Sequence, residues 1–317
     1  MDQIATAVKG HDFSRAEIGE KIVRGFSPCG VTVLRSNLNK SLLARMPGKF
    51  FPAILACVLA APLSAQAPLR IAAAADLEPV LPPILEQFQQ ATGIHAEATY
   101  QASAMLTTEI ENGAPFDLFL SADLSYPKRL IDDGLADAAG SADSTTPITY
   151  AKGTLVLWAR KTGAPADRSS SAGWKDSHLP APSLDLLRSP ALKRLAIANP
   201  DRAPYGRAAV AALQSLNLYD ALKPRLVTAE NIAQAAQFVD SANADAGLIS
   251  LTSALTPRLS ADGAYFVIPR NLYPPIEQGA VIVSSTKNRA AVHKLLDFLL
   301  SPAVQAQLAK SGLTPVK

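Results

Sequence analysis

Residues 69–93 read LRIAAAADLEPVLPPILEQFQQATG, and the fold prediction starts from this segment. The short apolar run 69–75 is typical of a buried strand. Asp76 follows it, and Asp is a preferred residue at a helix N-terminus. The next apolar residues have the spacing of one helix face: Leu77, Val80, Leu81, Ile84, Leu85 and Phe88. The segment therefore predicts a buried strand followed by an amphipathic helix that ends at Gly93.

The same alternation of strand and helix continues along the chain. Residues 94–100 and 116–121 have strand patterns, and a helix that starts at Ser103 lies between them. A further helix is expected over 126–132. This order predicts a parallel sheet with helices on its faces. Ligands of such sheets bind at the carboxyl ends of the strands, near helix N-termini.

The second half of the chain repeats this pattern after a long strand and a loop. The strand is expected over 149–160, interrupted by Gly153, and the loop-rich stretch covers 163–182. Further strands are expected at 195–198, 246–251, 265–268 and 279–284, and further helices at 204–216, 229–239, 289–300 and 302–311.

We predict a two-lobed α/β protein in which each lobe is a mostly parallel sheet flanked by helices. Lobe I would comprise 66–152 and 265–317, and lobe II would comprise 153–264. The chain would leave lobe I near Gly153 and return near Tyr265. Two crossings make a hinge, with room for a ligand between the lobes. Periodicity alone also permits one continuous doubly wound sheet.

Residues 1–65 are expected to be a leader. The fourteen-residue apolar run Phe50–Leu63 follows Arg45 and Lys49 and precedes the small residues at 64–67. This order is typical of a secretory signal peptide, and the run is shorter than the roughly 20 residues that span a membrane. A buried core helix is the alternative. We expect a gene-model extension over 1–45, a signal peptide over 46–65, and a periplasmic mature protein.

Composition and charge exclude several classes of function. Hydrophobic residues make up 48% of the chain and charged residues 18%, as in ordinary globular proteins. The leader contains eight of the 30 Lys and Arg and four of the 27 acidic residues, which leaves 22 basic and 23 acidic residues after it. Without a basic excess, we expect no nucleic-acid partner. Cys29 and Cys57 both lie in the leader, so no disulfide framework is expected beyond it.

The mature sequence lacks the usual enzyme motifs. Its His residues are scattered, and no GxSxG elbow, phosphate loop or GxGxxG after the first strand occurs. We therefore expect no enzymatic activity and no cofactor. A two-lobed secreted enzyme remains the alternative from another class.

Four predicted helix starts could bind an anion. Free backbone N–H groups and about half a positive charge occupy a helix N-terminus, so an anion binds there without Lys or Arg. The four segments are 75–77, 102–104, 199–207 and 228–232, two in each proposed lobe. Each alone is a weak signal, because most helix starts bind nothing.

Taken in order, the motifs around these starts are specific. They are AAAADL at 72–77, GAPFDLFLSAD at 113–123, NPDRAPYGRAA at 199–209, AENI at 229–232 and AGLISL at 246–251. Over roughly residues 69–317 the chain resembles the periplasmic molybdate-binding proteins of ABC uptake transporters, in the type II solute-binding protein family. The resemblance implies the type II periplasmic binding fold.

The resemblance also implies a ligand and partners. Molybdate or tungstate would be bound between the lobes by neutral hydrogen bonds and delivered by a monomer to a membrane permease. Ser103 matches a hydroxyl ligand, and Tyr205 and Ile232 match positions that donate backbone N–H groups. These three residues would hold the molybdate oxyanion, and no residue would bind the metal directly.

Two positions depart from the family pattern. Ala75 stands where relatives often have Ser, and Ser250 stands where many have a Tyr hydroxyl. Ser250 could bind through a water, or the Tyr205 phenol could replace it. These departures leave sulfate or another oxyanion as the alternative ligand, and a sensory role as an alternative to transport. Asp76 would repel a dianion, so we expect its carboxylate to cap its own helix and to face away from the ligand.

Overall fold

The computed structural model describes residues 67–138, 145–161 and 179–316. The described residues all belong to one compact unit, residues 62–317. This unit contains two separate sheets, so a single continuous sheet is excluded. The predicted signal peptide lies outside the described residues. Within the described ranges, no helix is long and apolar enough to cross a membrane.

The first sheet, which defines lobe I, has seven strands. They are β1 (Leu69–Ala74), β2 (Ala96–Gln101), β3 (Leu118–Ser121), β4 (Ala136–Asp137), β5 (Ile148–Gly153), β11 (Ile276–Val283) and β12 (Thr314–Pro315). Their order is β12-β5-β11-β3-β1-β2, and β4 pairs with β11. Strand β1 pairs in parallel with β2 and β3, whereas β11 is antiparallel to β3, β4 and β5.

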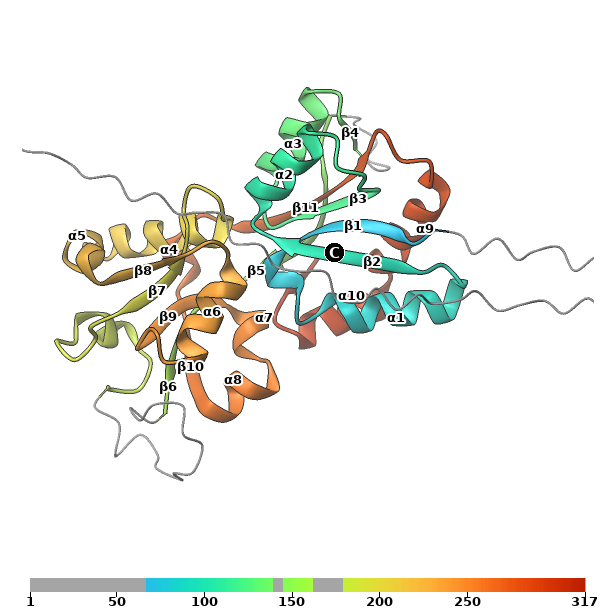
Figure 1. Cartoon of the computed structure of the whole chain (residues 1–317). Coiled ribbons are helices and arrows are strands. Elements are labelled where there is room, and N and C mark those ends of the chain that lie inside the picture. The colour runs from blue at the N-terminus through green and yellow to red at the C-terminus, as the bar shows by residue number, and fades with distance from the viewer. Residues whose placement is uncertain (1–66, 139–144, 162–178, 317) are drawn as a thin grey trace, which may run out of the picture. The chain divides into compact units, whose positions relative to one another are not determined.

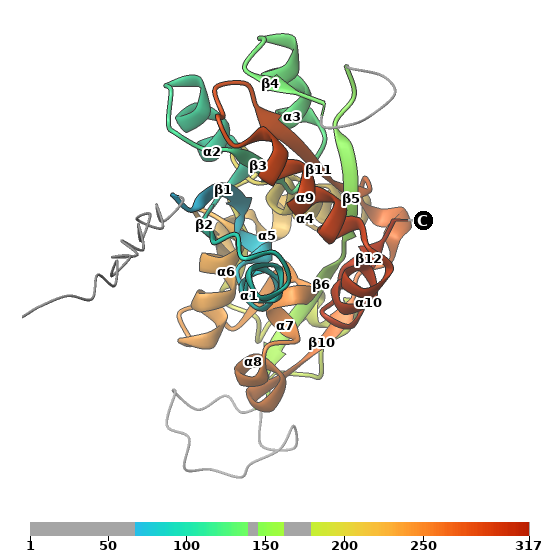
Figure 2. The ribbon, with the colours of Figure 1, turned by 90° about the vertical axis from the view of Figure 1, so that its right-hand side faces the viewer.

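Helices cover both faces of this sheet (Figures 1 and 2). They are α1 (Leu81–Thr92), α2 (Ser103–Glu111), α3 (Ser125–Asp132), α9 (Arg289–Leu300) and α10 (Pro302–Lys310). Ile71 and Ala73 of β1 pack in one core cluster with α1, α9 and α10, and Ala72 packs in another with α2 and α3. Burial on both faces explains why β1 is apolar from Ile71 to Ala74 rather than alternating, whereas Arg70 near its start is exposed.

The second sheet, which defines lobe II, has the strand order β10-β6-β9-β7-β8. Its strands are β6 (Leu155–Arg160), β7 (Leu195–Ala198), β8 (Leu226–Ala229), β9 (Ala246–Ser250) and β10 (Gly263–Val267). Its helices are α4 (Pro204–Ser215), α5 (Tyr219–Leu222), α6 (Ile232–Asp240), α7 (Leu251–Ala254) and α8 (Pro257–Asp262). Short 3₁₀ turns are η1 (Ala75–Leu77), η3 (Leu184–Arg188), η4 (Lys223–Arg225) and η5 (Arg270–Leu272).

The chain passes between the sheets twice. It leaves lobe I between Gly153 and Leu155 and returns between Val267 and Ile276. The predicted return at Tyr265 is too early, because Tyr265 pairs with Trp158 inside lobe II. The sheets are also mixed rather than mostly parallel. The outgoing strand β5 and the returning strand β11 lie side by side, and two strands that cross in opposite directions must pair antiparallel.

The first predicted helix buries the expected face but begins later than predicted. All six apolar residues from Leu77 to Phe88 are buried. However, α1 begins at Leu81, with proline in its first turn, and Asp76 lies in the preceding 3₁₀ turn η1. Pro82 and Pro83 would lie in the interior of a continuous helix from Asp76, where the missing N–H groups break the hydrogen bonding, whereas they suit the first turn of a helix that begins at Leu81. Asp76 is therefore not the N-cap of α1.

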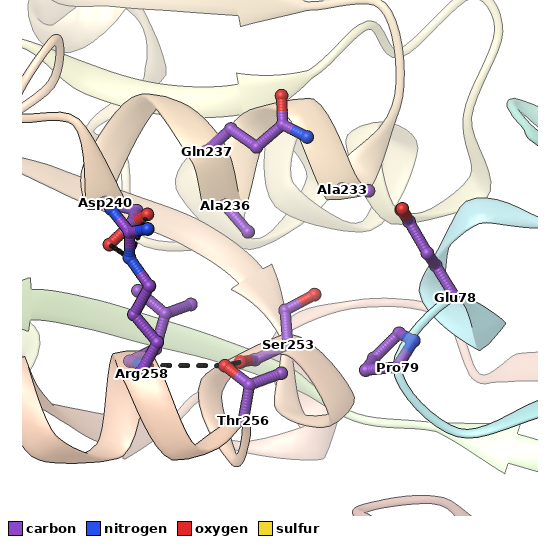
Figure 3. A pocket seen from close by; sticks show the side chains of 10 residues that line it. Glu78, Pro79, Ala233, Ala236, Gln237, Asp240, Ser253, Thr256 and Arg258 are labelled. Carbon is purple, nitrogen blue, oxygen red and sulfur yellow. Dashed lines mark hydrogen bonds and ion pairs between the residues drawn. The ribbon is translucent and has the colours of Figure 1, made fainter. Parts of the chain in front are cut away.

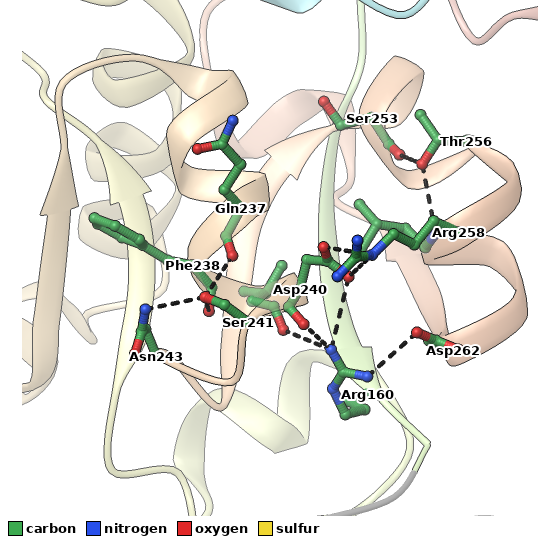
Figure 4. A network of polar contacts seen from close by, with 12 residues as sticks. Arg160, Gln237, Phe238, Asp240, Ser241, Asn243, Ser253, Thr256, Arg258 and Asp262 are labelled. Atoms are coloured by element: carbon green, nitrogen blue, oxygen red, sulfur yellow. Dashed lines mark hydrogen bonds and ion pairs between the residues drawn. The ribbon is translucent and has the colours of Figure 1, made fainter. Parts of the chain in front are cut away.

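The C-terminal end of α6 is fixed by a charged network (Figure 4). Arg160 of β6 donates to the carbonyl oxygens of Val239 and Asp240, and its guanidinium lies 3.4 Å from Asp262. Arg258 of α8 binds the Asp240 carboxylate at 2.6 Å. Cations near the last carbonyls of a helix are favourable. The network holds the C-terminal end of α6 against β6 and α8. It thereby also fixes the position of the N-terminus of α6 at Ile232.

Helix α4 begins in close contact with the end of β7, and Gly206 permits this contact. A Cβ at Gly206 would lie 2.3 Å from the Ala198 carbonyl oxygen and 2.7 Å from the Asn199 carbonyl carbon. Both are backbone atoms, so neither can move without shifting the strand end. The sequence PYG at 204–206 therefore sets how deeply α4 sits in lobe II.

We predict that Gly206→Ala lowers the free energy of unfolding by about 2–3 kcal/mol, because the added methyl group overpacks a site bounded by backbone. Gln214→Ala, an exposed position in the same helix, is the control and should change it by less than about 0.5 kcal/mol. Urea unfolding measures both. Equal effects of the two substitutions would contradict the close packing.

Candidate functional site

A small cavity lies between the two lobes. The cavity is about 10 Å³ in volume, roughly the size that holds one water molecule and far below the roughly 300–1,000 Å³ of pockets for organic ligands. Its lining therefore leaves no room for an organic ligand. The lining residues are Ala74, Ala75, Asp76, Gln101, Ala102, Ser103, Ala122, Ala203, Pro204, Tyr205, Asn231 and Ile232.

The cavity lies at the carboxyl ends of parallel strands in both sheets. In lobe I, β1 ends at Ala74, β2 ends at Gln101, and Ala122 follows β3. In lobe II, the segments after β7 and β8 supply the remaining lining residues. This is the place where ligands bind in α/β sheets. Gln101 and Ala122 were not singled out from the sequence, although each follows a predicted strand.

Three helices from the two lobes begin at this cavity. Ser103 is the first residue of α2, Tyr205 the second of α4, and Ile232 the first of α6. Amides at these positions have no acceptor within their own helix. In the described part of the chain, the amides of Ser103, Tyr205 and Ile232 have no other backbone acceptor. Each helix start also carries about half a positive charge, so the cavity favours a negative guest.

The Ser103 side chain adds a hydroxyl donor. Its Oγ accepts a hydrogen bond from the Ala122 amide at 3.1 Å, and the residue is 1% exposed. Because Oγ is already an acceptor, its proton remains for another partner, and the described residues offer none. Alanines at 75, 102 and 203 leave room for a ligand to approach the backbone.

Asp76 is buried beside these donors. Its Oδ2 accepts hydrogen bonds from the Tyr205 hydroxyl at 3.1 Å and from the Gln278 side-chain amide of β11. Its carbonyl oxygen accepts from the Thr252 hydroxyl of α7 at 2.7 Å. Burial raises the pKa of Asp76 to about 7, although the hydrogen bonds from Gln278 and Tyr205 partly oppose the shift. The residue thus ties lobe I to α4 and α7 of lobe II.

These contacts correct two expectations. The Asp76 carboxyl does not cap its own helix, because η1 has no side-chain cap and α1 begins five residues later. The Tyr205 phenol does not take the place of the tyrosine hydroxyl that many relatives have at position 250, because it donates its hydrogen bond to Asp76. Gly153 makes this contact possible, since a Cβ there would lie 2.3 Å from the Tyr205 hydroxyl oxygen. Gln278 was missed, because no sequence pattern connects residues 202 positions apart.

The structure does not bring Ser250 to the cavity. Ser250 is the N-cap of α7, and its Oγ accepts from the Ser253 amide at 3.2 Å. The same Oγ lies 2.9 Å from Thr252 Oγ1, which contacts the Asp76 carbonyl. The predicted contact of Ser250 with the ligand is therefore not supported, because its hydroxyl caps the N-terminus of α7. The other predicted residues, Ala75, Asp76, Ser103, Tyr205 and Ile232, all line the cavity.

Further polar contacts join the lobes outside the cavity. The Ala104 amide donates to the Arg202 carbonyl oxygen at 3.2 Å. Arg207 of α4 binds the Asp123 carboxylate of lobe I and donates to the Tyr126 hydroxyl at 3.2 Å. Arg202 binds Glu230 within lobe II. Neither arginine lines the cavity, so a ligand there would be bound without a cationic side chain.

A larger hollow of about 260 Å³ lies elsewhere at the lobe boundary. Figure 3 shows Glu78 and Pro79 on one side of it, with Asp240 and Arg258 opposite. Its charged lining residues are Glu78, Asp240 and Arg258, and Arg258 is paired with Asp240. This excess of negative charge is unsuited to an anion. No group of three or more metal-ligating side chains occurs among the described residues.

Comparisons with known proteins agree with this architecture. Residues 69–314 match the sequence model of a family described as bacterial extracellular solute-binding protein. The molybdate-binding protein ModA of Azotobacter vinelandii is 35% identical over 82% of this chain and 93% of its own length. ModA of Rhodobacter capsulatus is 34% identical over 71% of this chain and 79% of its own length.

Two solved structures with a similar fold are also of solute-binding proteins. The periplasmic molybdate-binding protein of Azotobacter vinelandii superposes with a TM-score of 0.66 at 29% identity, over 78% of this chain and all of that protein. The sulfate-binding protein SubI of Mycobacterium tuberculosis, at 17% identity and a TM-score of 0.60 over 78% of this chain and 87% of its own, shares the two-lobed fold. By its family match, its relatives and its two-sheet architecture, the chain belongs to the bacterial extracellular solute-binding proteins.

Proposed function

We propose that this protein captures molybdate or tungstate in the interlobe cavity and delivers it to the membrane permease of an ABC transporter. The observation that carries the proposal is the convergence of three helix N-termini and the Ser103 hydroxyl on one small void. Two relatives with at least 34% identity are named molybdate-binding proteins. The oxyanion is the cargo, and no cofactor takes part.

The donor set suits a fully deprotonated oxyanion. The amides of Ser103, Tyr205 and Ile232 and the Ser103 hydroxyl can all donate hydrogen bonds, and a tetrahedral dianion offers only acceptors. A protonated oxyanion such as hydrogen phosphate would place its own O–H against a donor. Each buried donor left without an acceptor costs about 1–3 kcal/mol. The cavity therefore selects against phosphate through hydrogen bonding rather than through charge.

Separation of molybdate from sulfate must come from size, because both are tetrahedral dianions. The distance between the donors of α2 in lobe I and those of α4 and α6 in lobe II depends on how the lobes close. A smaller anion that touched the donors of one lobe would not reach those of the other. Sulfate is accordingly the most informative competitor.

We also propose the cellular setting that this function requires. The protein acts in the periplasm, after removal of the signal peptide at residues 46–65, and works as a monomer. Capture would stabilise the contact between the lobes, since a ligand that touches both favours the closed form. The permease would then recognise the closed surface. No step in this cycle needs catalysis.

Calorimetry of residues 66–317 with four anions tests the proposal. We expect tight binding of molybdate and tungstate at neutral pH, and at least 100-fold weaker binding of sulfate and phosphate. Sodium chloride at matched ionic strength is the control for nonspecific charge effects. Tight binding of sulfate alone would assign the site to another oxyanion, and binding of none of the four would reject oxyanion capture.

A second test removes one donor. Ser103→Ala should weaken molybdate binding by about 1–2 kcal/mol, the cost of one hydrogen bond to a charged group. Thr108→Ala, an exposed hydroxyl in the same helix, is the matched control and should leave the affinity unchanged. If Ser103→Ala binds as tightly as the wild type, Ser103 does not belong to the site.

A further inference from the structure

The Asp76 carboxyl has one oxygen without a hydrogen-bond partner. Oδ2 accepts from Tyr205 and Gln278, but in the described part of the chain Oδ1 is buried and has none. The side-chain oxygen of Gln278 is likewise buried without a donor. The side chains of Asp76 and Gln278 are hydrogen-bonded to each other. The buried pair therefore contains two acceptor oxygens, Oδ1 of Asp76 and Oε1 of Gln278, that receive no hydrogen bond. A proton on Oδ1 would supply a donor at this point.

No cationic side chain compensates the carboxyl. Among the described residues that line the cavity, Asp76 is the one carboxylic acid and there is no Lys, Arg or His. The titratable groups that face it are two buried tyrosines, Tyr205 of α4 and Tyr150 of β5, and burial raises the pKa of both well above the usual value. Both therefore stay neutral at physiological pH.

The other elements packed against Asp76 bring no charge to it. Helix α7 has no ionisable residue, and the acid of α6, Asp240, lies at its far end and is bound by Arg160 and Arg258. Glu78 is exposed, and Glu277 of β11 is paired with Lys152. On β2, burial raises the pKa of Tyr100 to about 12, so it too is neutral.

Bound oxyanion and charged carboxylate would occupy neighbouring positions in this cavity. Two like charges in one desolvated site raise each other's pKa, and the group with the higher pKa binds the proton first. The void borders Asp76 directly, and the described residues that line it include no cationic side chain. Resting on the function proposed above, we propose that Asp76 binds the oxyanion as a neutral carboxylic acid, so that capture of one dianion is coupled to one proton held on Asp76.

The sign of the pH dependence follows from this coupling. Burial already raises the pKa of Asp76 to about 7 without ligand, and a neighbouring dianion raises it further. Below pH 7 Asp76 is protonated both in the free protein and in the oxyanion complex, so the affinity for the oxyanion is constant. Above pH 7 the free protein loses the proton but the complex keeps it, so binding takes up a proton and affinity falls about tenfold per pH unit.

The experiment is calorimetric titration of the mature protein with sodium molybdate, at pH 6 to 9, in buffers of different ionisation enthalpy. At pH 8 the wild type should take up close to one proton per molybdate, and its affinity should fall roughly 50-fold between pH 7 and 9. Asp76→Asn, an uncharged group of the same shape, should take up none and should bind more tightly than the wild type at pH 9. Ser103→Ala should bind more weakly but keep the proton uptake.

The outcomes separate this inference from the proposed function. If molybdate does not bind at any pH, the proposed function itself fails. If the wild type binds molybdate with no proton uptake at pH 8, only the neutral Asp76 is wrong. A folded Asp76→Asn protein, checked by circular dichroism, that keeps the pH dependence or loses all binding also overturns it. The wild-type proton count decides the question even if the variant does not fold.

Discussion

The N-termini of α2, α4 and α6 meet at one cavity although they belong to two different sheets. Three partial positive charges in a small buried space repel one another, so this arrangement needs negative charge or hydrogen-bond acceptors between them. The Asp76 carboxyl accepts from Tyr205 and Gln278 rather than from the amides of these helix starts. An anion bound between the lobes would supply the acceptors, and would do so only while both lobes are in contact. Binding and closure therefore depend on the same interaction.

The connection between the lobes is built from few elements. Strand β5 continues into β6 past Gly153, whose missing side chain gives the Tyr205 hydroxyl access to Asp76. Alanines 74, 75, 102 and 122 of lobe I belong to the same core cluster as the interior of lobe II. Arg207 adds a charged contact with Asp123 at the surface. Small residues and short polar contacts hold the lobes together, and such an interface can separate without exposing a large apolar core.

Much of this could be predicted from the sequence, and the failures have physical causes. The strand and helix around residues 69–93 follow from local periodicity, and the helix starts at Ser103 and Pro204 follow from strand ends and from the proline itself. Helix α6 begins at Ile232, three residues after the predicted 229, because Asn231 caps it. Ser250 was assigned by analogy of position, and its role as a cap depends on where α7 begins. The Asp76–Gln278 contact and the late return after β10 depend on pairing between distant segments, which local patterns do not encode. The prolines after Asp76 were a signal that could have placed the start of α1 correctly.

In the proposed complex, uncharged donors of both lobes surround one oxyanion. A crystal structure of the mature protein grown with tungstate tests it directly, because anomalous scattering locates tungsten without reference to the rest of the density. We expect one tungsten atom in the cavity, with its oxygens within hydrogen-bond distance of Ser103 Oγ and of the Tyr205 and Ile232 amides. Tungsten in the larger hollow beside Glu78 and Arg258, or against the donors of one lobe alone, would contradict it.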